Sequence, residues 1–346
     1  MKHQTTRYGE IPFYKIGTFG NTADAFISKK LFLEYKTKYS FPKKGDILIS
    51  ASGTIGRAVI YDGKPAYFQD SNIVWIDNDE TLVKNDFLFY TYSNVKWNTE
   101  HTTILRLYND NFRNTLIPLP PLNEQNAIAN VLSGLDRYLC ALDALILKKE
   151  GVKKALSFEL LSQRKRLKGF NQAWQRVRLG DIANYLTSNL SVEQITQQGK
   201  IKVYDVNNFI GYTDTTFISD KPYISIVKDG SVGRVRILPP KTSILSTMGA
   251  LIANHRTTTE FLFYLLSNFD FKNFTSGSII PHIYFKDYKE KTIFLPPLNE
   301  QSAIANILST LDNEITSLKN KKRQFENIKK ALNHDLMSAK IRVLEK

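Results

Sequence analysis

The polar residues of this chain that are best placed to contact a ligand gather around two glycine-rich stretches. Gly53-Thr-Ile-Gly-Arg57 and Gly230-Ser-Val-Gly-Arg234 each combine adjacent backbone N–H groups with one guanidinium, which suits an anion such as phosphate. Neither stretch has the spacing of a Walker loop or of a dinucleotide fingerprint. Two interpretations stay open: a contact with a DNA backbone, or a tight strand connection that requires glycine.

Further polar side chains surround these stretches and could read a nucleic acid. Arg, Gln and Asn can make two hydrogen bonds to a base edge, whereas Ser, Thr and Lys bind phosphates as readily. Each could equally be a solvated loop residue. The candidate DNA-contacting residues are Ser52, Thr54, Arg57, Gln69, Ser71, Asn72, Thr102, Thr103 and Arg106 in the first half of the chain, and Lys228, Ser231, Arg234, Thr247, Thr275, Ser276 and Ser278 in the second.

Residue patterns for catalysis are scarce. The five histidines show no metal-ligand spacing, and the single cysteine, Cys140, is expected to be an inert thiol on a helix, so we expect no metal site. Asp24 with Glu34 and Lys36 could hold a divalent ion in a nuclease. The second half of the chain has no counterpart of this arrangement, so a nuclease is the weaker hypothesis.

An internal repeat positions both glycine-rich stretches. Leu119-Pro-Pro-Leu-Asn-Glu-Gln125 returns as Leu295-Pro-Pro-Leu-Asn-Glu-Gln301, and Phe87-Leu-Phe-Tyr returns as Phe261-Leu-Phe-Tyr. The chain is therefore two related modules, each followed by a nearly identical helical segment. The modules diverge more than the helices do, as expected if the two modules read different targets.

The modules have mixed secondary structure. Residues 45–50 predict a strand, residues 51–56 a glycine-rich turn, residues 58–61 a returning strand and residues 72–76 a further strand, whereas residues 87–97 have a helix-compatible aromatic face. The expected fold class is α+β, with two pseudo-repeated domains of about 120 residues joined by two long antiparallel coiled-coil helices.

Each helical segment follows a Pro-Pro pair, with Asn123 as the expected N-cap and Glu124 in the first turn. A length of about 40 residues corresponds to roughly 60 Å. The two helices could pair with each other, or each could pack on its own module. The apolar residues of the heptad-like seam are Leu135, Leu139, Leu142 and Ile146 in the first helix, and Leu311, Ile315, Leu318, Phe325, Leu332 and Leu336 in the second.

These patterns divide the chain at residues 1–120, 121–168, 169–295 and 296–346, as module, helix, module and helix. The formal charge is +14, and every one of the four segments is net positive by three or four. An even spread of this kind fits a long phosphate footprint, although solubility alone would also explain it. The absence of a leader-like segment and of a long apolar run predicts a soluble, cytoplasmic protein.

At this level the layout resembles the specificity subunit of type I restriction-modification systems over nearly the whole chain. The residues that carry the resemblance are the two Leu-Pro-Pro-Leu-Asn-Glu-Gln segments with the Ala-Ile-Ala that follows each, the stretch at 45–57, and Trp174-Gln-Arg-Val-Arg-Leu-Gly-Asp-Ile182. The resemblance implies two target-recognition domains that each read half of a bipartite DNA sequence, with the paired helices setting the gap.

The resemblance also implies a division of labour. Methylation would belong to partner modification subunits, two in number, that bind S-adenosylmethionine, and cleavage to ATP- and Mg-dependent restriction subunits. This chain would bind no cofactor, which agrees with its lack of an Asn/Asp-Pro-Pro-Tyr/Phe motif. The helices would dock the partners, and Arg164, Lys165, Arg166 and Lys168 could contact DNA or an acidic partner.

The first module departs from the pattern at its start. About 25 residues from Trp174 precede Gly199-Lys-Ile201, whereas only eight precede the matching Gly9-Glu-Ile11. We therefore expect the first module to lack the counterpart of residues 174–182. A missing strand and turn, a late start, or a rearranged or truncated form are three open explanations.

Overall fold

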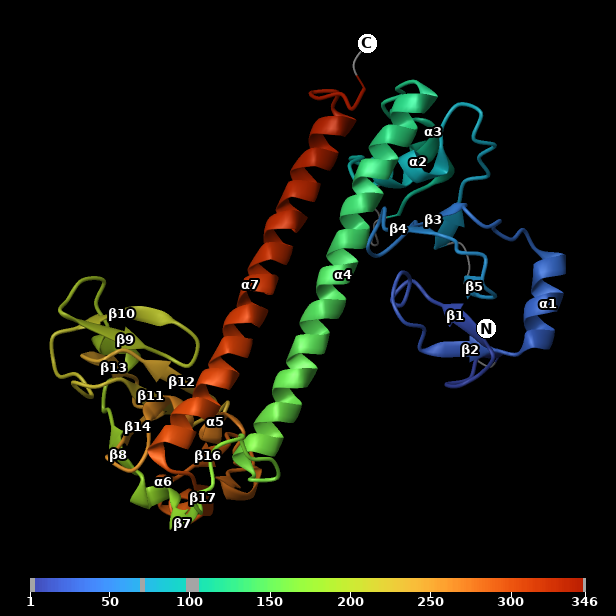
Figure 1. Ribbon diagram of the computed structural model, residues 1–346. Coiled ribbons are helices and arrows are strands. Elements are labelled where there is room, and N and C mark those ends of the chain that lie inside the picture. Colours follow the sequence, from blue (N-terminus) through green and yellow to red (C-terminus); the bar gives the residue numbers. More distant parts are fainter. Residues whose placement is uncertain (1–3, 69–71, 98–105, 345–346) are drawn as a thin grey trace. The chain divides into compact units, whose positions relative to one another are not determined.

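The computed structural model of the protein describes residues 4–68, 72–97 and 106–344 (Figure 1). The chain forms two compact units. Unit 1 comprises residues 1–143 and 320–346, and unit 2 comprises residues 144–319. Each unit therefore holds one module together with part of each long helix.

Unit 1 contains two three-stranded sheets. The first has the order β2 (Ala25–Ile27), β1 (Ile11–Tyr14) and β5 (Tyr67–Phe68), with β2 antiparallel and β5 parallel to β1. The second has the order β4 (Ala58–Ile60), β3 (Ile47–Ser50) and β6 (Ile73–Trp75), all antiparallel. The helices of this module are α1 (Lys29–Lys38), α2 (Asn85–Tyr92) and α3 (Asn109–Arg113).

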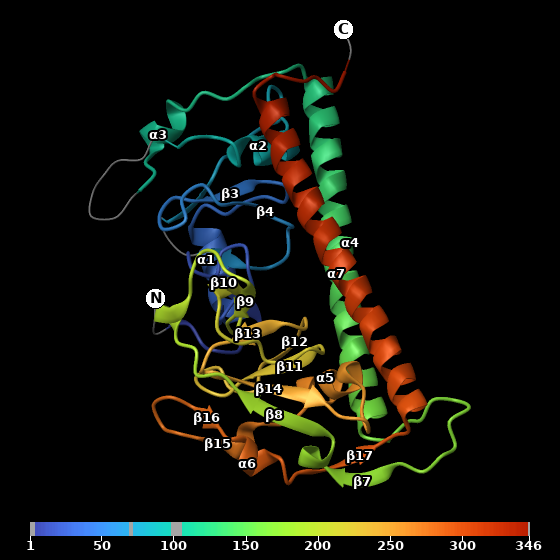
Figure 2. The same ribbon diagram turned by 90° about the vertical axis from the view of Figure 1, so that its left-hand side faces the viewer.

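Unit 2 repeats this plan with additional strands. Its main sheet has the order β12 (Val235–Leu238), β11 (Tyr223–Val227), β14 (Met248–Ala253) and β8 (Ala183–Thr187), and Figure 2 shows β8 at its edge. A second sheet has the order β10 (Phe209–Thr213), β9 (Ile201–Tyr204) and β13 (Thr242–Ile244). Two further antiparallel pairs are β17 (Thr292–Leu295) with β7 (Gln175–Arg178) and β15 (Thr275–Ser276) with β16 (His282–Ile283). The helices of this module are α5 (Thr259–Ser267) and α6 (Phe285–Tyr288).

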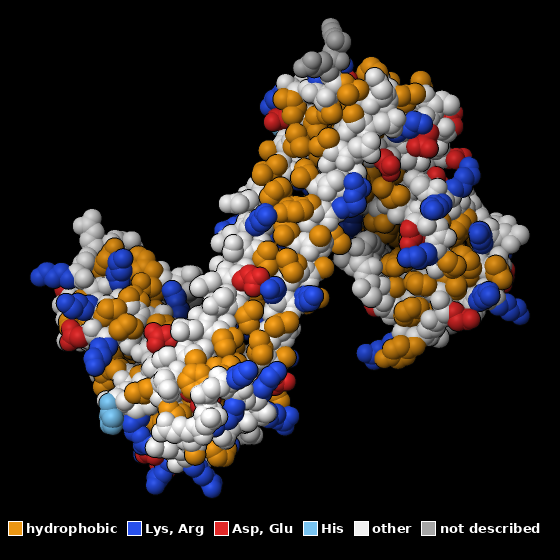
Figure 3. Space-filling view, viewed as in Figure 1, with side chains coloured by type: hydrophobic (Ala, Val, Ile, Leu, Met, Phe, Trp, Pro, Cys, Tyr) orange, Lys and Arg blue, Asp and Glu red, His pale blue; other side chains and the backbone are white. Residues whose placement is uncertain are grey.

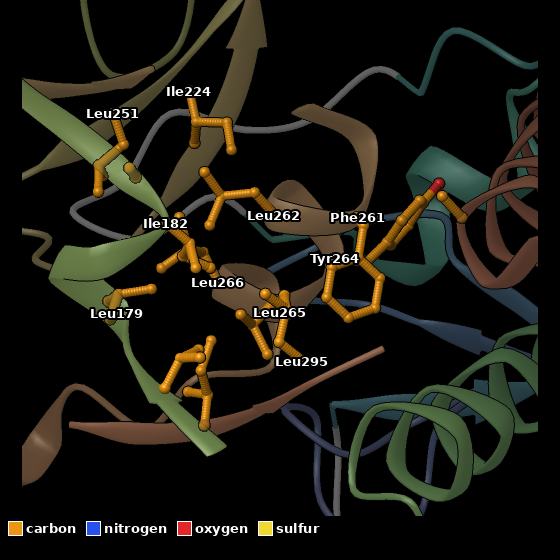
Figure 4. Close-up of a cluster of buried hydrophobic side chains, with 14 of the residues drawn as sticks. Leu179, Ile182, Ile224, Leu251, Phe261, Leu262, Tyr264, Leu265, Leu266 and Leu295 are labelled. Atoms are coloured by element: carbon orange, nitrogen blue, oxygen red, sulfur yellow. The ribbon is translucent and has the colours of Figure 1, made fainter. Parts of the chain in front are cut away.

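The core of unit 2 forms where α5 lies between the main sheet and the long C-terminal helix. Thr258 caps α5 by accepting a hydrogen bond from the Phe261 N–H at 3.2 Å. In Figure 4, Phe261, Leu262, Leu265 and Leu266 project from α5, with Ile224 and Leu251 of the sheet and Leu179 and Ile182 around them. Each large aliphatic side chain buried in this way contributes roughly 1.5–3 kcal/mol.

The two long helices are α4 (Leu122–Leu161) and α7 (Leu298–Met337), and each has 40 residues, as predicted. The prediction that Asn123 is the N-cap is wrong, because the helix already includes Leu122. Asn123 Oδ1 instead accepts a hydrogen bond from the adjacent Glu124 N–H at 3.0 Å. None of the ten predicted seam residues is exposed. No helix in the described part of the chain is both long and apolar enough to cross a membrane.

Ion pairs show that the helices run antiparallel in both units. In unit 1, α4 Asp136 and Asp143 pair with α7 Lys329 and Lys322. In unit 2, α4 Lys149 pairs with α7 Glu314 at 2.8 Å, and Lys153 pairs with Asp312 at 2.5 Å. In each unit the residue number rises along one helix as it falls along the other. The predicted α+β fold class with two long antiparallel helices is confirmed.

The repeat also shows which strands unit 1 lacks. The order β4-β3-β6 matches β12-β11-β14, but the described residues of unit 1 supply no strand in the place of β8. Residues 116–119 match β17, and no described strand pairs with them as β7 pairs with β17. The expected absence of a counterpart to residues 174–182 is thus seen in the described part of unit 1.

Candidate nucleic-acid interface

The glycine-rich turn of unit 1 joins β3 to β4 and has little conformational freedom. The Ser50 hydroxyl donates to the Thr54 carbonyl and accepts from the Arg57 N–H at 3.0 Å. Gly53 and Gly56 have φ of 67° and 81°, and a Cβ on Gly56 would lie 2.3 Å from the Trp97 indole nitrogen. The glycines therefore serve a tight strand connection, whether or not the turn also contacts a ligand.

The corresponding turn of unit 2 joins β11 to β12 with the same backbone bonds. The Gly233 N–H donates to the Val227 carbonyl at 2.9 Å, as the Gly56 N–H donates to that of Ser50 at 3.0 Å. A Cβ on Gly233 would lie 2.7 Å from the Phe271 ring. The two turns are therefore equivalent positions of the two modules.

The arginines that end the two turns have different surroundings. Arg57 is exposed, and its Nη1 donates to the Phe19 carbonyl at 2.9 Å, which fixes one end of the guanidinium. Arg234 is exposed, and within the described ranges no residue forms a hydrogen bond or ion pair with its side chain. Both guanidiniums have N–H groups available for an anion, and Arg57 is the more preorganised of the two.

In each unit a second loop reaches the glycine turn. In unit 2 the Gly230 N–H donates to the Pro281 carbonyl at 2.8 Å, and the Ile283 N–H donates to the Lys228 carbonyl at 2.9 Å. In unit 1 the Leu107 N–H donates to the Ala51 carbonyl at 2.9 Å. Residues 52–57 thus lie beside Arg106, and residues 228–230 beside residues 281–283, to which the candidates Thr275 and Ser276 are joined by the pairing of β15 with β16.

The candidates differ in exposure. Thr54, Arg57, Arg106, Ser231, Arg234, Thr247, Thr275, Ser276 and Ser278 are exposed, and Asn72 and Lys228 are partly buried. Ser52 is only 8% exposed, and its hydroxyl donates to Asn72 Oδ1 at 2.9 Å, so Ser52 holds the turn rather than facing solvent. Gln69, Ser71, Thr102 and Thr103 lie outside the described residues.

An acid–imidazole pair was missed by the sequence analysis. His282 Nδ1 lies 2.6 Å from Asp229 Oδ1. These two residues also form an isolated β-bridge, and Ser52 and Arg106 form the equivalent bridge in unit 1. Because 53 positions separate Asp229 and His282, no local pattern could reveal the pair. Equivalent sites of the two units thus carry different polar side chains.

The structure also shows the surroundings of three other sets of residues named from the sequence. Arg166 already has an acidic partner within unit 2, since its Nη2 pairs with the buried Glu300 carboxylate at 2.7 Å. Cys140 lies on α4, as predicted, and is exposed. Asp24 pairs with Lys15 at 2.8 Å and Lys36 lies 5.2 Å from the Phe41 ring centroid, so both have partners other than a shared metal ion.

Within the described ranges no group of three His, Cys, Asp or Glu side chains could hold a metal ion. Lysines and arginines are spread over both modules and along the helices on the face shown in Figure 3, rather than gathered in one patch. Of the other basic positions after α4, Arg164 stacks on Phe158 at 4.5 Å, Lys165 lies 3.8 Å from Glu159, and Lys168 is exposed.

Solved structures share this fold. A type I restriction-modification S subunit from M. genitalium superposes with a TM-score of 0.64 at 20% identity, covering 97% of this chain and 91% of that one. A chain from a study of complex assembly and conformational transition of the type I restriction-modification system superposes with a TM-score of 0.55 at 16% identity, covering 85% and 82%.

Sequence relatives agree with the structural likeness. A type I restriction enzyme specificity subunit from Haemophilus influenzae is 64% identical over 133 residues, which is 38% of this chain and 34% of the relative. The match therefore spans about a third of that relative's length. The MjaX specificity subunit from Methanocaldococcus jannaschii is 28% identical over 337 residues, covering 86% of this chain and 79% of that one.

The family model of the type I restriction modification DNA specificity domain matches residues 1–149 and 171–327, one match for each repeat. This chain belongs to the family of type I restriction-modification specificity subunits.

Proposed function

We propose that this chain recognises a bipartite DNA sequence, with unit 1 reading one half and unit 2 the other, and that it performs no catalysis itself. The observation that carries the proposal is the equivalence of the two loop clusters. Both units place a glycine turn ending in an exposed arginine beside a second loop, yet Ser52 and Arg106 stand where unit 2 has Asp229 and His282. A shared backbone with different polar side chains fits two readers of different base sequences.

The proposal divides the DNA contacts into two kinds. Arg57 and Arg234, at the ends of the turns, would bind phosphates, because each has free guanidinium N–H groups next to backbone N–H groups. The side chains of the second loops, Arg106 in unit 1 and Thr275, Ser276, Ser278 and His282 in unit 2, would lie nearer to base edges.

The partners complete the activity. Modification subunits, expected in two copies, would supply S-adenosylmethionine-dependent methylation, and restriction subunits would supply ATP- and Mg-dependent cleavage. The seam residues of α4 and α7 are turned inward within each unit, so docking would use the outer surface of the helices. Leu145, Leu147 and Val152 are exposed apolar residues of α4 and are candidates for such a surface.

A selection experiment tests the proposal. The chain, copurified with its modification subunits, is incubated with a library of random-sequence duplexes, and the retained DNA is sequenced at several salt concentrations. We expect two constant sequence blocks separated by a constant gap, with an affinity that falls steeply as salt is raised. Retention without sequence preference, or affinity that does not respond to salt, would favour a protein-binding scaffold instead.

A further inference from the structure

Unit 2 contains a strand-turn-strand segment, residues 174–187, that binds three surfaces of its own unit. β7 pairs with β17, aligning Val177 with Ile293 and Gln175 with Leu295. β8 pairs with β14 along five residues. The Trp174 indole N–H donates to Glu300 at 2.9 Å. The apolar side chains of the segment, Trp174, Val177, Leu179 and Ile182, belong to the main core of unit 2.

Unit 1 retains the counterparts of all three surfaces. Residues 116–119 correspond to β17 and β6 corresponds to β14. Glu124 corresponds to Glu300, is almost fully buried, and pairs with Arg342 as Glu300 pairs with Arg166. Unit 1 therefore has counterparts of the surfaces that contact residues 174–187 in unit 2.

Exposure shows what the described part of unit 1 leaves uncovered. Leu295 of β17 is 4% exposed, whereas its counterpart Leu119 is 57% exposed. Ile117, the counterpart of the buried Ile293, is only partly buried, and Leu116 beside it is 95% exposed, as its counterpart Thr292 is also exposed. In unit 2 the cover is β7, which pairs with this stretch over its whole length.

A cavity of about 420 Å³ in unit 1 is lined by Leu116 and Pro118 of this extended segment. Its lining also includes Thr91 of α2, Thr115 and Met337 of α7. In unit 2 the counterparts of Thr91 and Met337 are Leu265 and Leu161, which belong to or pack against the core that contains the fully buried Leu179. The counterpart of Thr115 is Lys291, whose carbonyl accepts the Leu179 N–H at 3.0 Å. The cavity thus lies where unit 2 seats Leu179.

The described residues before β1 do not take the place that residues 174–182 have in unit 2. Thr6 forms a β-bridge with Phe26, as Thr196 does with Tyr212 in unit 2. Residues 4–10 therefore occupy the place of residues 194–200, which follow the strand-turn-strand segment. Among the described residues of unit 1, none takes the place of residues 174–182 over Leu119 and the cavity.

We propose that unit 1 binds, by strand addition, a polypeptide segment from outside residues 1–346 that has the apolar pattern of residues 174–182: Trp, then Val three positions on, Leu two further and Ile three further. Its first strand pairs with residues 116–119, its leucine enters the cavity, and its indole N–H donates to Glu124. Main-chain hydrogen bonds supply affinity and the alternate side chains supply specificity.

A labelled peptide with the sequence of residues 172–188 is the probe. We expect saturable one-to-one binding to the full chain by fluorescence anisotropy. Leu119→Asp and a peptide carrying Leu179→Asp should each weaken binding by about tenfold or more, because each removes a large apolar contact. Leu119 is exposed, so its substitution leaves the fold intact. Leu33→Asp, at an exposed position of α1, is the matched control and should leave binding unchanged.

A fusion provides a second measurement. Trp174 follows Arg166 by eight residues, and residues 171–188 appended after Lys346 place their tryptophan eight residues after Arg342. We expect slower amide hydrogen exchange at β6 and at residues 116–119 in the fusion, with no change in β17 or β14.

Four outcomes would overturn the proposal. Peptide binding that is not saturable, equal binding by the Leu119→Asp variant, or unchanged exchange in the fusion would each contradict the acceptor site. A dimer of the unmodified chain that the peptide dissociates would assign the surface to a second copy instead. DNA recognition by unit 2 is unaffected by any of these results, so this test is independent of the proposed function.

Discussion

At the residue scale, the glycines of the two turns are required by the fold, whereas the arginines that follow them are available to bind a ligand. The glycines are required by positive φ at Gly53, Gly56, Gly230 and Gly233 and by the close approach of an aromatic ring in each unit. The arginines that follow are not required by the fold in the same way, because both are exposed. Substituting the arginines therefore tests DNA binding without breaking the turns.

Arg234→Ala should weaken binding to specific and random DNA alike, because a phosphate contact carries no sequence information. We expect the slope of log affinity against log salt to fall by about one unit. The measurement is a fluorescence titration of the assembled complex at several salt concentrations. Arg323→Ala, at an exposed position of α7, is the matched control. A loss confined to the specific sequence would contradict the phosphate role and indicate a base contact.

Buried tyrosines make unit 2 sensitive to alkaline pH. Burial raises the pKa of Tyr223 to about 12, and its hydroxyl lies 3.0 Å from Thr242 Oγ1. A raised pKa stabilises the fold fully below pH 10, and this contribution is lost as pH rises through about 12, with a slope of up to roughly 1.4 kcal/mol per pH unit.

Tyr223→Phe should therefore flatten the decline of stability between pH 10 and 12 in denaturant titrations. The variant starts from a lower stability at neutral pH, because the bond to Thr242 is lost. Tyr8→Phe, at an exposed position, is the control. A decline as steep as that of the unsubstituted chain would show that Tyr223 is not the group responsible.

The sequence predicted which loops hold the candidate residues, but it did not predict the side-chain partners of those residues. The loops that hold the candidates do lie beside one another, because the repeat fixed their order along equivalent strands. The burial of Ser52 and the pairing of Arg166 with Glu300 could not be predicted, since each depends on a residue 20 or 134 positions away.

At the element scale, the repeated Leu-Asn-Glu-Gln segment fastens each long helix to its module. Gln301 is fully buried, accepts a hydrogen bond from the Thr258 N–H at 3.0 Å, and donates to the Arg256 and Pro296 carbonyls. Gln125 makes the same three kinds of bond in unit 1, to Lys84, Leu82 and Pro120. The near-identity of this motif in the two halves is thus explained by one shared structural role.

Gln301→Ala should destabilise unit 2 by about 1 to 3 kcal/mol, because it leaves buried backbone groups without partners. Chemical denaturation followed by tryptophan fluorescence is a suitable measurement, since Trp174 lies in the core of unit 2. Gln324→Ala, at an exposed position on the same helix, should change stability by less than about 0.5 kcal/mol. Equal effects of the two substitutions would refute the fastening role.

A second repeated contact ties the same helices to the modules. The Tyr264 hydroxyl donates to Asp312 at 2.9 Å, and Lys153 pairs with the same carboxylate. Tyr90 donates to Asp136 at 2.7 Å in unit 1. Burial, together with the accepting carboxylate, raises the pKa of both tyrosines well above their usual range, so both remain neutral donors at physiological pH.

The sequence predicted the long helices well, and the three strands predicted at residues 45–50, 58–61 and 72–76 correspond to β3, β4 and β6. A seam of apolar residues over 40 positions is a strong periodic signal, and all ten seam residues proved to be at least partly buried. The pairing of β7 with β17 could not be predicted, because it joins segments more than a hundred residues apart with no turn between them. The other strands, of two to six residues, were not predicted, because segments this short carry little periodicity to distinguish them from loops.

At the scale of the whole molecule, the helices are the only elements that contribute to both compact units within the described part of the chain, since α4 and α7 each cross the boundary between them. If the two units read separate halves of a DNA site, helix length should set the gap between the halves.

Inserting seven residues after Asp143 in α4 and seven after Lys319 in α7 keeps the heptad seam in phase and lengthens both helices by about 10 Å. We expect the gap in the recognised DNA to increase by about three base pairs, with both half-sequences unchanged. The selection experiment measures this directly. Inserting the heptad into α4 alone should destabilise the seam instead. An unchanged gap in the double insertion would contradict a spacing role for the helices.

The most direct test of the two-reader account is a map of methylated adenines in a methylation-free host that expresses this chain with its modification subunit. The account predicts a two-part motif with a fixed gap. It also predicts that replacing residues 275–283 with the loop of another family member changes one half of the motif and leaves the other half unchanged. A motif with a single block, or a loop replacement that alters both halves together, would contradict the account.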